Sequence, residues 1–238
     1  MQGPDADDAA CTTRPVEPVA PSLSQGIGNL RVAMAGGYFQ NNVFPEAQEA
    51  VARVAKALGA TTTVELPEAA RARAAAYIIT TTEGASLHLD RLRKRPDDFD
   101  PAVRDRLIAG AMIPAPFVDK AQKFRRWYRA QVLELFKSVD VILAPATPCV
   151  APKLGQVTFV LDGVELPVRA NIGIHTQPIS FIGLPVAAVP VWTTGERLPI
   201  GVQVIAAPWR EDVALRIAHA LEADGVAVAP RPRQWGND

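Results

Sequence analysis

Cysteine and histidine are scarce in this sequence, and each shortage narrows the possible chemistry. The 238 residues include two cysteines, Cys11 and Cys149, and three histidines, His88, His175 and His219. Two cysteines cannot build the disulfide framework of a small secreted domain. The histidines lie far apart, and none belongs to an HxH or HExxH pair, so the sequence predicts no metal site.

Long hydrophobic runs and an excess of one charge are also missing. No stretch approaches the roughly 18 apolar residues of a membrane-spanning helix, and residues 1–10 contain no apolar core of a signal peptide. Lys+Arg and Asp+Glu both number 25, which argues against wholesale binding of a polyanion. With 48% apolar residues, the chain is expected to fold. Together with the two cysteines, these absences lead us to expect a cytoplasmic protein that binds neither membrane nor nucleic acid.

The common cofactor and nucleophile motifs are absent as well. AGGYFQNN (35–42) follows a predicted strand, but its glycine spacing differs from the G-x-G-x-x-G of dinucleotide-binding proteins. The sequence contains no P-loop and no G-x-S-x-G nucleophile elbow. We therefore expect no cofactor.

The chain divides into a short arm and one α/β domain. Residues 1–29 are rich in proline and aspartate, which predicts an extended linker or arm. From residue 30 onward, LRVAMAG (30–36) predicts a strand, a helical repeat runs from Pro45 to Gly59, and TTTVEL (61–66) predicts a second strand. This order indicates a β-α-β unit with parallel strands.

The remaining pattern alternates helices and strands. Residues 68–138 are mostly helical, most clearly at 117–136, where the apolar residues Phe117, Ala121, Phe124, Tyr128, Val132 and Leu135 recur at helical spacing. Further elements are strands at 139–145, 186–192 and 200–206, a hairpin around Asp162-Gly163, and a helix at 211–224. The pattern predicts a layered α/β/α fold with a mixed sheet.

Cys149 has two interpretations. It lies in PATPCVAP, just past a predicted strand, where an open α/β sheet can present a nucleophile. The favoured interpretation is a small, buried hydrophobic residue beside prolines, because no histidine or basic residue flanks Cys149 to lower the pKa of its thiol.

A basic stretch at 120–129, KAQKFRRWYR, also has two interpretations. It resembles a phosphate or nucleic-acid face. We favour the solvated side of the helix at 117–136, because the rest of the chain returns the net charge to zero.

The segment 174–190, IHTQPISFIGLPVAAVP, combines an apolar run with His175, Thr176, Gln177 and Ser180. Pro178 favours a helix start, with Thr176 or Gln177 near the N-cap. Free N–H groups at that end would suit a carbonyl or carboxylate ligand. A plain cap and turn before the next strand explains the same residues, and the sequence alone does not separate the two.

Several motifs resemble the C-terminal half of the amidase-signature family. They are DVILAPATPCVAP (140–152), EGASLHLDRLRKR (83–95), IHTQPISFIGLPVAAVPV (174–191) and LPIGVQVIAAPWREDVALRIAHALE (198–222). The residues 1–18 resemble a segment that follows the catalytic core in this family. The resemblance covers residues 1–230, and EGASLHL, FDPAVRDRLIAGA and GIHTQPISFIGLP resemble the 1-carboxybiuret hydrolase subgroup most.

The resemblance implies a substrate site. Glu83, His88, His175, Thr176, Gln177 and Ser180 belong to segments that line the pocket of the family, so we expect them to converge on one concavity. Arg91 is a further candidate, since a guanidinium matches a substrate carboxylate. The substrate implied is a small amide, of the 1-carboxybiuret or urea type.

The catalytic residues of the family have no counterpart here. The family uses a Ser nucleophile, a cis-Ser and a Lys, with the serines in a loop resembling GGSSGGS, and this sequence has no such loop. We therefore assign no catalytic residue and expect the C-terminal portion of an amidohydrolase, inactive alone. The missing N-terminal half or a small subunit would be its partner; a non-catalytic remnant, or a subunit completing another chain's site, is the alternative.

A chain that lacks half of a fold should expose surface that the other half covers. The strands at 139–145 and 200–206 are apolar enough to be covered on both faces in a complete enzyme. We therefore expect apolar patches larger than the few hundred Å² usual for a monomer.

Overall fold

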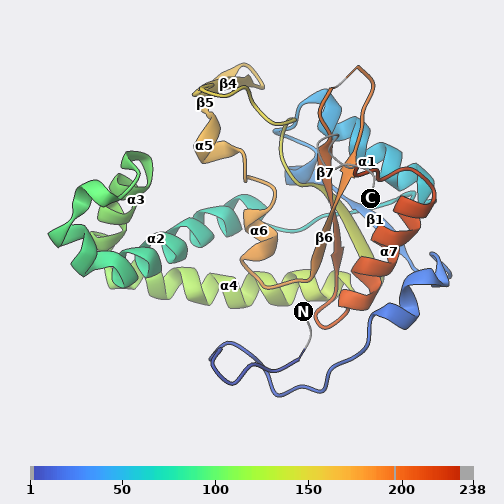
Figure 1. Cartoon of the computed structure of the whole chain (residues 1–238), viewed down its shortest axis with the longest axis horizontal. Helices are drawn as coiled ribbons and strands as arrows, with labels where there is room; N and C mark the ends of the chain where they lie inside the picture. Colours follow the sequence, from blue (N-terminus) through green and yellow to red (C-terminus); the bar gives the residue numbers. More distant parts are fainter. Residues whose placement is uncertain (1–2, 196, 231–238) are drawn as a thin grey trace, which may run out of the picture.

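A five-stranded mixed β-sheet forms the centre of the protein (Figure 1). The structure is a computed structural model and describes residues 3–195 and 197–230. The strands follow the order β2-β1-β3-β7-β6; β2, β1 and β3 run parallel, and β7 is antiparallel to both β3 and β6. This is the layered α/β fold with a mixed sheet that the sequence predicts.

The elements lie close to the expected ranges. The strands are β1 (Val32–Ala35), β2 (Thr62–Val64), β3 (Val141–Pro145), β4 (Thr158–Leu161), β5 (Val164–Pro167), β6 (Val186–Val191) and β7 (Ile200–Ala206). The α-helices are α1 (Pro45–Ala57), α2 (Ala69–Lys94), α3 (Pro101–Ala111), α4 (Ala115–Leu135), α5 (Val168–Asn171), α6 (Gln177–Ser180) and α7 (Glu211–Ala223). Short 3₁₀ helices are η1 (Ala20–Gln25), η2 (Gly37–Phe39) and η3 (Pro96–Asp98).

The predicted β-α-β unit is confirmed by strands β1 and β2 and helix α1. Pro45 occupies the first turn of α1, where its missing N–H costs no hydrogen bond. Gly59 follows the C-cap with φ +63°, the left-handed conformation that ends many helices. The chain then returns to β2, which pairs with β1 in parallel.

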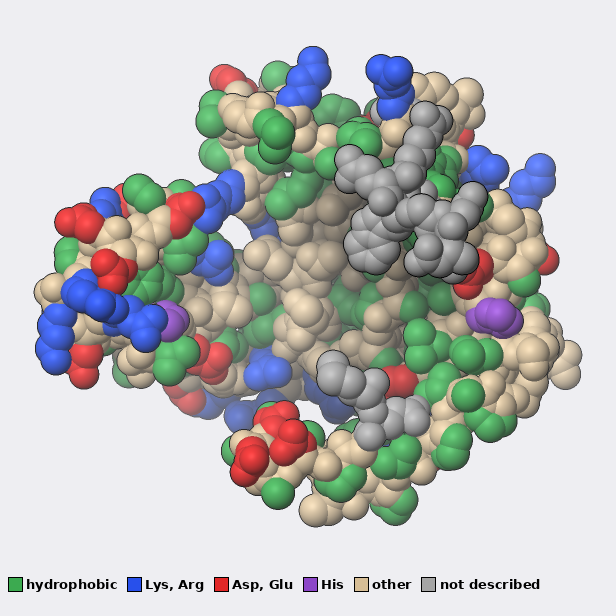
Figure 2. Space-filling view, in the orientation of Figure 1, with side chains coloured by type: hydrophobic (Ala, Val, Ile, Leu, Met, Phe, Trp, Pro, Cys, Tyr) green, Lys and Arg blue, Asp and Glu red, His purple; other side chains and the backbone are tan. Residues whose placement is uncertain are grey.

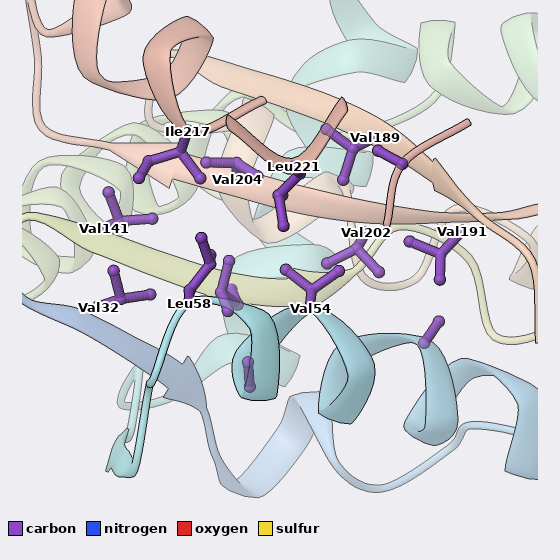
Figure 3. Close-up of a cluster of buried hydrophobic side chains, with 14 of the residues drawn as sticks. Val32, Val54, Leu58, Val141, Val189, Val191, Val202, Val204, Ile217 and Leu221 are labelled. Carbon is purple, nitrogen blue, oxygen red and sulfur yellow. The ribbon is translucent and has the colours of Figure 1, made fainter. Parts of the chain in front are cut away.

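Helices cover both faces of the sheet. On one face, α1 and α7 enclose an apolar core, which Figure 3 shows between Val54 of α1 with the following Leu58 and Ile217 and Leu221 of α7. On the other face, α2 and α4 pack against the sheet, with Tyr128 fully buried. The apolar stripe of α4 begins at Ala121 rather than at the predicted Phe117, which is 52% exposed.

The helices α2 and α3 pack unusually closely. Gly110 of α3 lies against Thr81 of α2, so that a Cβ at position 110 would meet the Thr81 carbonyl oxygen at 2.2 Å. Real Cβ atoms do not approach a backbone atom so closely, and the helices would have to separate. Gly84 of α2 is a less demanding position, because a Cβ there would meet only the end of the flexible Leu107 side chain, at 2.8 Å.

The substitution Gly110→Ala should therefore destabilise the protein by about 2 kcal/mol, after allowing for the helix propensity that alanine adds. Urea unfolding followed by circular dichroism measures this loss. The matched control is Gly84→Ala in the facing helix, which should stay within about 0.5 kcal/mol of the unaltered chain. Equal effects of the two substitutions would contradict the proposed close approach of the helices.

The hairpin β4–β5 stands apart from the main sheet. Asp162 and Gly163 connect its strands with φ values of +51° and +78°, as a tight hairpin turn requires. Phe159 and Leu161 pack inward with Ile174 in a small separate core. This hairpin confirms the turn predicted from the sequence.

The N-terminal arm lies along α7. Arg216 of α7 donates from Nε to the Gly26 carbonyl oxygen, and the guanidinium of Arg14 lies 4.8 Å from the ring centre of Trp209. Residues 20–25 of the predicted extended arm form the 3₁₀ helix η1. Residues 1 and 2 of the arm lie outside the described part.

Exposed apolar side chains lie elsewhere than expected. The strands β3 and β7 are buried almost completely within this chain, so they do not form the exposed patches. Large exposed apolar side chains lie instead on α2 to α4, on the hairpin and on β6; they include Leu87, Met112, Phe117, Trp127, Leu154, Val157, Val160 and Val186. In the described residues, no helix is long and apolar enough to cross a membrane.

Candidate functional site

The carboxyl ends of β1 and β3 form a crevice of the kind where α/β proteins bind ligands. From β1 the chain passes over one face of the sheet through α1, and from β2 to β3 it passes over the other face through α2 to α4. Since the connection that leaves β1 and the connection that enters β3 lie on opposite faces of the sheet, the order of the chain reverses between these two neighbouring strands. Open α/β sheets bind ligands at the carboxyl ends of strands at such a point, so this position is the candidate binding site.

The segment Ile174–Gln177 is fixed at this position by hydrogen bonds that side chains donate to its backbone. Tyr38, which follows β1, donates its hydroxyl to the Ile174 carbonyl oxygen at 3.0 Å. The buried side chain of Gln203 on β7 donates to the carbonyl oxygens of Pro145, at 2.8 Å, and His175, at 3.1 Å. The segment is thus held at the ends of both strands.

His175 is fully buried within this crevice. Its ring packs beside those of Tyr38 and Phe39, with centroids 5.9 and 6.0 Å away. The Nε2 atom is 3.4 Å from the Asn41 carbonyl oxygen, and Nδ1 has no hydrogen-bond partner among the described residues. Burial lowers the pKa of His175 to about 4, and the nearby Arg73 adds to that effect. The imidazole is therefore neutral at pH 7.

Arg73 of α2 anchors the next residues of the segment. Its Nε donates to the Gln177 side-chain oxygen at 3.1 Å, and its Nη2 donates to the Ala170 carbonyl oxygen and to Oδ1 of Asn171 at 2.8 and 3.1 Å. Because Arg73 requires an acceptor, the Gln177 amide is oriented with its nitrogen directed away. The Gln177 amide nitrogen has no partner among the described residues and remains available as a donor.

The other predicted site residues lie further along α2. Glu83 follows Arg73 by ten residues, or about 15 Å along the helix axis. His88 packs edge-on against Phe99 with centroids 5.7 Å apart, and Arg91 is exposed. Within the described part, no hydrogen bond, ion pair or ring contact joins Glu83, His88 or Arg91 to the segment 175–180.

A cavity of about 340 Å³ lies beside the crevice. It opens at the ends of β1 and β3 and is bounded on the far side by α1. Its lining is mostly apolar, with Gln40 and Gln48 as its polar side chains; the other lining residues are Met34, Ala35, Phe39, Val43, Ala47, Val51, Ala52 and Pro145. None of the predicted site residues lines it, although Phe39 joins it to the His175 ring.

The predicted helix start at Pro178 is confirmed, but its N–H groups are not all free. Thr176 is the N-cap residue of α6, without a side-chain cap. The Gln177 N–H donates to the Gly173 carbonyl oxygen at 3.2 Å, and the Thr176 hydroxyl donates to the same carbonyl. The helix has only four residues, and we assign no ligand to its N-terminus.

The described residues hold no activated nucleophile. Burial raises the pKa of the Cys149 thiol to about 11, so the thiol stays protonated at neutral pH. Ser22, Ser138 and Ser180 donate their hydroxyls to backbone carbonyls. In the described part, no lysine, histidine or carboxylate is hydrogen bonded to a serine or to Cys149, so residues 3–195 and 197–230 present no nucleophile–base pair of an acyl-transfer enzyme.

The basic stretch 120–129 serves mainly structural contacts. Arg125 and Arg129 donate to the carbonyl oxygens of Phe181 and Ile182, at 2.6 and 3.1 Å, and so join α4 to the loop before β6. Lys123 pairs with Asp119 at 2.7 Å. On the neighbouring lobe of α3 and the end of α2, Figure 2 shows acidic and basic side chains intermixed. These contacts support the interpretation of a solvated, structural helix.

Three important residues of the site carried little signal in the sequence. Tyr38, Arg73 and Gln203 hold the segment, yet each belongs to a different element. A glutamine inside the apolar strand IGVQVIA was a possible signal, because a buried polar side chain must find partners. Arg73 stands in an alanine-rich helix, where periodicity does not distinguish it.

Arg73→Met should loosen the segment and destabilise the chain by about 1.5 kcal/mol, because three acceptors lose a charged donor. Chemical unfolding provides the measurement. Arg71→Met is the matched control, since Arg71 forms only an exposed ion pair with Glu68 and should change stability by less than about 0.5 kcal/mol. An equal change in both variants would show that Arg73 does not anchor the segment.

Comparison with solved structures places the same fold in amidases. A structure described as a vestigial protein complex, on the origins of an s-triazine catabolic enzyme, superposes with a TM-score of 0.92 and 46% identity; the match covers 95% of this chain and 50% of that one. A crystal structure of an amidase superposes with a TM-score of 0.74 and 26% identity, covering 82% of this chain and 45% of the other.

Sequence comparison gives the same result. The chain is 46% identical to AtzE, the 1-carboxybiuret hydrolase subunit of Pseudomonas sp. (strain ADP), covering 95% of this chain and 50% of the relative. It is 31% identical to a glutamyl-tRNA(Gln) amidotransferase subunit of Myxococcus xanthus (strain DK1622), covering 93% and 50%. The chain thus spans about half the length of these relatives. Because the amidase family model matches residues 1–215, the chain belongs to the amidase family.

Proposed function

We propose that this chain forms the C-terminal half of an amidase that hydrolyses a small urea-type amide, and that it builds one wall of the substrate site. The observation that carries the proposal is the fixed segment Ile174–Gln177. The side chains of Gln203 on β7 and of Tyr38 after β1 donate hydrogen bonds to its backbone and hold it at the carboxyl ends of β1 and β3, where open α/β sheets bind ligands.

Gln177 is the substrate-contacting residue that the geometry favours. Its side-chain oxygen is held by Arg73, so its N–H groups point away from Arg73 and are without a partner among the described residues. A substrate carbonyl oxygen is the matching acceptor, and hydrogen bonds of this kind position an amide for attack. His175, by contrast, is buried and acts by holding the segment in place.

The other candidates retain the roles proposed from the resemblance. Arg91 is exposed, and its guanidinium has no partner among the described side chains, so it is available for a substrate carboxylate. Glu83, His88, Thr176 and Ser180 would line the remainder of the site. No contact within the described part joins Glu83 and His88 to the segment, so their roles rest on the resemblance alone.

The nucleophile, its base and the oxyanion-binding groups would come from the remaining half of the amidase fold. The chain would then complete a site rather than form one alone. A complex is described for the relative with 46% identity, which supports assembly with a second chain, including a small subunit, as part of this proposal.

The proposal is tested by combining this chain with the half of the Pseudomonas AtzE protein that it does not match, by co-expression. Ammonia release from carboxybiuret measures turnover. Gln177→Glu keeps the contact with Arg73 but replaces the outward donor by an acceptor, so KM should rise by at least about tenfold. Gln25→Glu, in the arm, is the matched control and should leave KM unchanged.

Two results would count against the proposal. A Gln177→Glu complex with an unchanged KM would remove Gln177 from the substrate site. A stable complex with no ammonia release from urea-type amides would favour the alternative, a non-catalytic remnant.

A further inference from the structure

The cavity beside the crevice has the size of a small-molecule site. Its volume is about 340 Å³, and small-molecule pockets typically measure roughly 300–1,000 Å³. An apolar cavity of about 150 Å³ is already large enough to bind benzene. The cavity therefore has room for a molecule with one or two rings.

The floor of the cavity is buried and apolar. It includes the buried side chains of Phe39, Val43 and Ala47, together with Ala35 and Pro145 at the ends of β1 and β3. None of the described residues that line the cavity carries a charge. A carboxylate or an ammonium group would lose its hydration there without gaining an ionic partner, so the cavity suits an uncharged molecule.

The mouth of the cavity offers a hydrogen-bond acceptor in a fixed orientation. Gln48 of α1 is exposed there, and its Nε2 atom donates to the backbone carbonyl oxygen of Gln40 at 3.2 Å. A carbonyl oxygen can only accept, so this contact fixes which end of the Gln48 amide is the nitrogen. The Oε1 atom of Gln48 accepts no hydrogen bond from the described residues and is available to a donor on a ligand.

These properties differ from those that a urea-type substrate requires. Carboxybiuret is small and polar, and its carboxylate is matched by a cationic side chain. The cavity presents apolar surface instead, and Gln177, the residue proposed to contact that substrate, does not line it. The cavity is therefore separate from the proposed substrate wall.

Phe39 connects the cavity to the candidate site. It lines the cavity, and the centroid of its ring lies 6.0 Å from that of the His175 ring. His175 belongs to the segment Ile174–Gln177, which Tyr38 and Gln203 hold in place. A molecule in the cavity would thus touch a side chain that packs beside this segment.

We propose that this cavity binds an uncharged aromatic molecule of one or two rings that carries an N–H or O–H donor. The rings lie against the floor formed by Met34, Phe39 and Val43, and the donor points to Oε1 of Gln48 at the mouth. The proposal concerns this chain alone and does not depend on the proposed function.

The first test compares indole with benzofuran, which has the same two rings but lacks the N–H. A two-dimensional NMR titration of the 238-residue chain gives the Kd of each compound. Ligands of this size are expected to bind with a Kd of roughly 0.1–1 mM. Indole should bind at least about threefold more tightly than benzofuran, because only indole can donate to Gln48.

Gln48→Met keeps the length of the side chain but removes the acceptor. It should bring the affinity for indole down to that for benzofuran. Gln25→Met is the matched control, because the Gln25 side chain also donates to a backbone carbonyl oxygen, that of Pro21, but lies in the arm. No binding of either compound at millimolar concentration, or the same loss in both variants, overturns the proposal.

The second test fills the cavity. Val51 of α1 lines it, so Val51→Phe places a larger side chain in open space and should unfold at nearly the same temperature as the unaltered chain. Its affinity for indole should fall at least about tenfold, because both rings need the same space. The matched control is Val103→Phe in α3, another partly buried helical valine, which does not line the cavity and should keep the affinity. Unchanged affinity in Val51→Phe overturns the proposal, and the Gln48→Met comparison does not depend on this variant.

Histidine NMR signals report where indole binds. The ring proton signal of His175 should shift during the titration, because Phe39 lies between its ring and the cavity lining. The signals of His88 and His219, which do not line the cavity, should stay in place. A shift of His88 or His219 without one of His175 overturns the proposal. Loss of indole binding in a complex with the unmatched half of the Pseudomonas AtzE protein also overturns it, because that half would then occupy the cavity.

Discussion

The purified chain should release no ammonia from carboxybiuret or other urea-type amides above the rate in buffer. Hydrolysis of an amide requires a nucleophile, a base and oxyanion-binding donors placed together. The described residues do not bring a nucleophile and a base together, and burial holds the Cys149 thiol protonated. Loss of a complete nucleophilic apparatus removes on the order of 10⁶-fold in rate.

Cys149→Ala is the control for this prediction. It should be indistinguishable from the unaltered chain, because the thiol has no base beside it among the described residues. Robust turnover that disappears in Cys149→Ala would show that the chain is a cysteine hydrolase and would refute its interpretation as an incomplete amidase.

The second large effect concerns acid stability and depends on His175. In the folded chain, burial lowers the pKa of His175 to about 4 from the ordinary 6.5. Between these values the unfolded state binds a proton that the folded state does not. The free energy of unfolding therefore has its full value, as far as His175 is concerned, above pH 6.5. It decreases as the pH falls from 6.5 toward 4. The loss is on the order of 3 kcal/mol.

Urea unfolding at a series of pH values between 7 and 4 measures this loss, compared with His175→Gln. Carboxylates such as Asp140 and Asp212 also make stability depend on pH, because hydrogen bonds from arginines lower their pKa values. Their effect is the same in both proteins, so subtracting the stability of the variant from that of the unaltered chain removes it. The unaltered chain should lose about 3 kcal/mol more than the variant. His219→Gln, at an exposed position of α7, should behave like the unaltered chain; parallel curves for all three would contradict the buried, neutral imidazole.

Local patterns were sufficient to predict most of the fold. The β-branched run at 61–66, the proline at the start of α1 and the glycine after its end each act within a few residues, and the structure places them as expected. The sheet partners of β3 and β7 were not predictable in the same way. Their apolar composition indicates burial on both faces, but only the structure shows that helices of this same chain pack on both faces of the two strands.

The candidate site was predictable only in part, because its contacts are long-range. The segment 174–180 stands out by its polar residues among prolines. Its fixation depends on Arg73, 104 residues away from Gln177, and on Tyr38, 136 residues away from Ile174. Whether Glu83 and His88 join the same site remains a prediction, since they lie about 15 Å and about 22 Å beyond Arg73 along the helix axis.

Reconstitution tests the central claim most directly. A fixed amount of this chain is titrated with the unmatched half of the Pseudomonas AtzE protein, and ammonia release from carboxybiuret is followed. The account predicts no turnover from either half alone and turnover that rises to a plateau at one-to-one stoichiometry. Turnover by this chain without the other half, or none at any ratio in a complex that forms, would contradict the claim that it completes an amidase site.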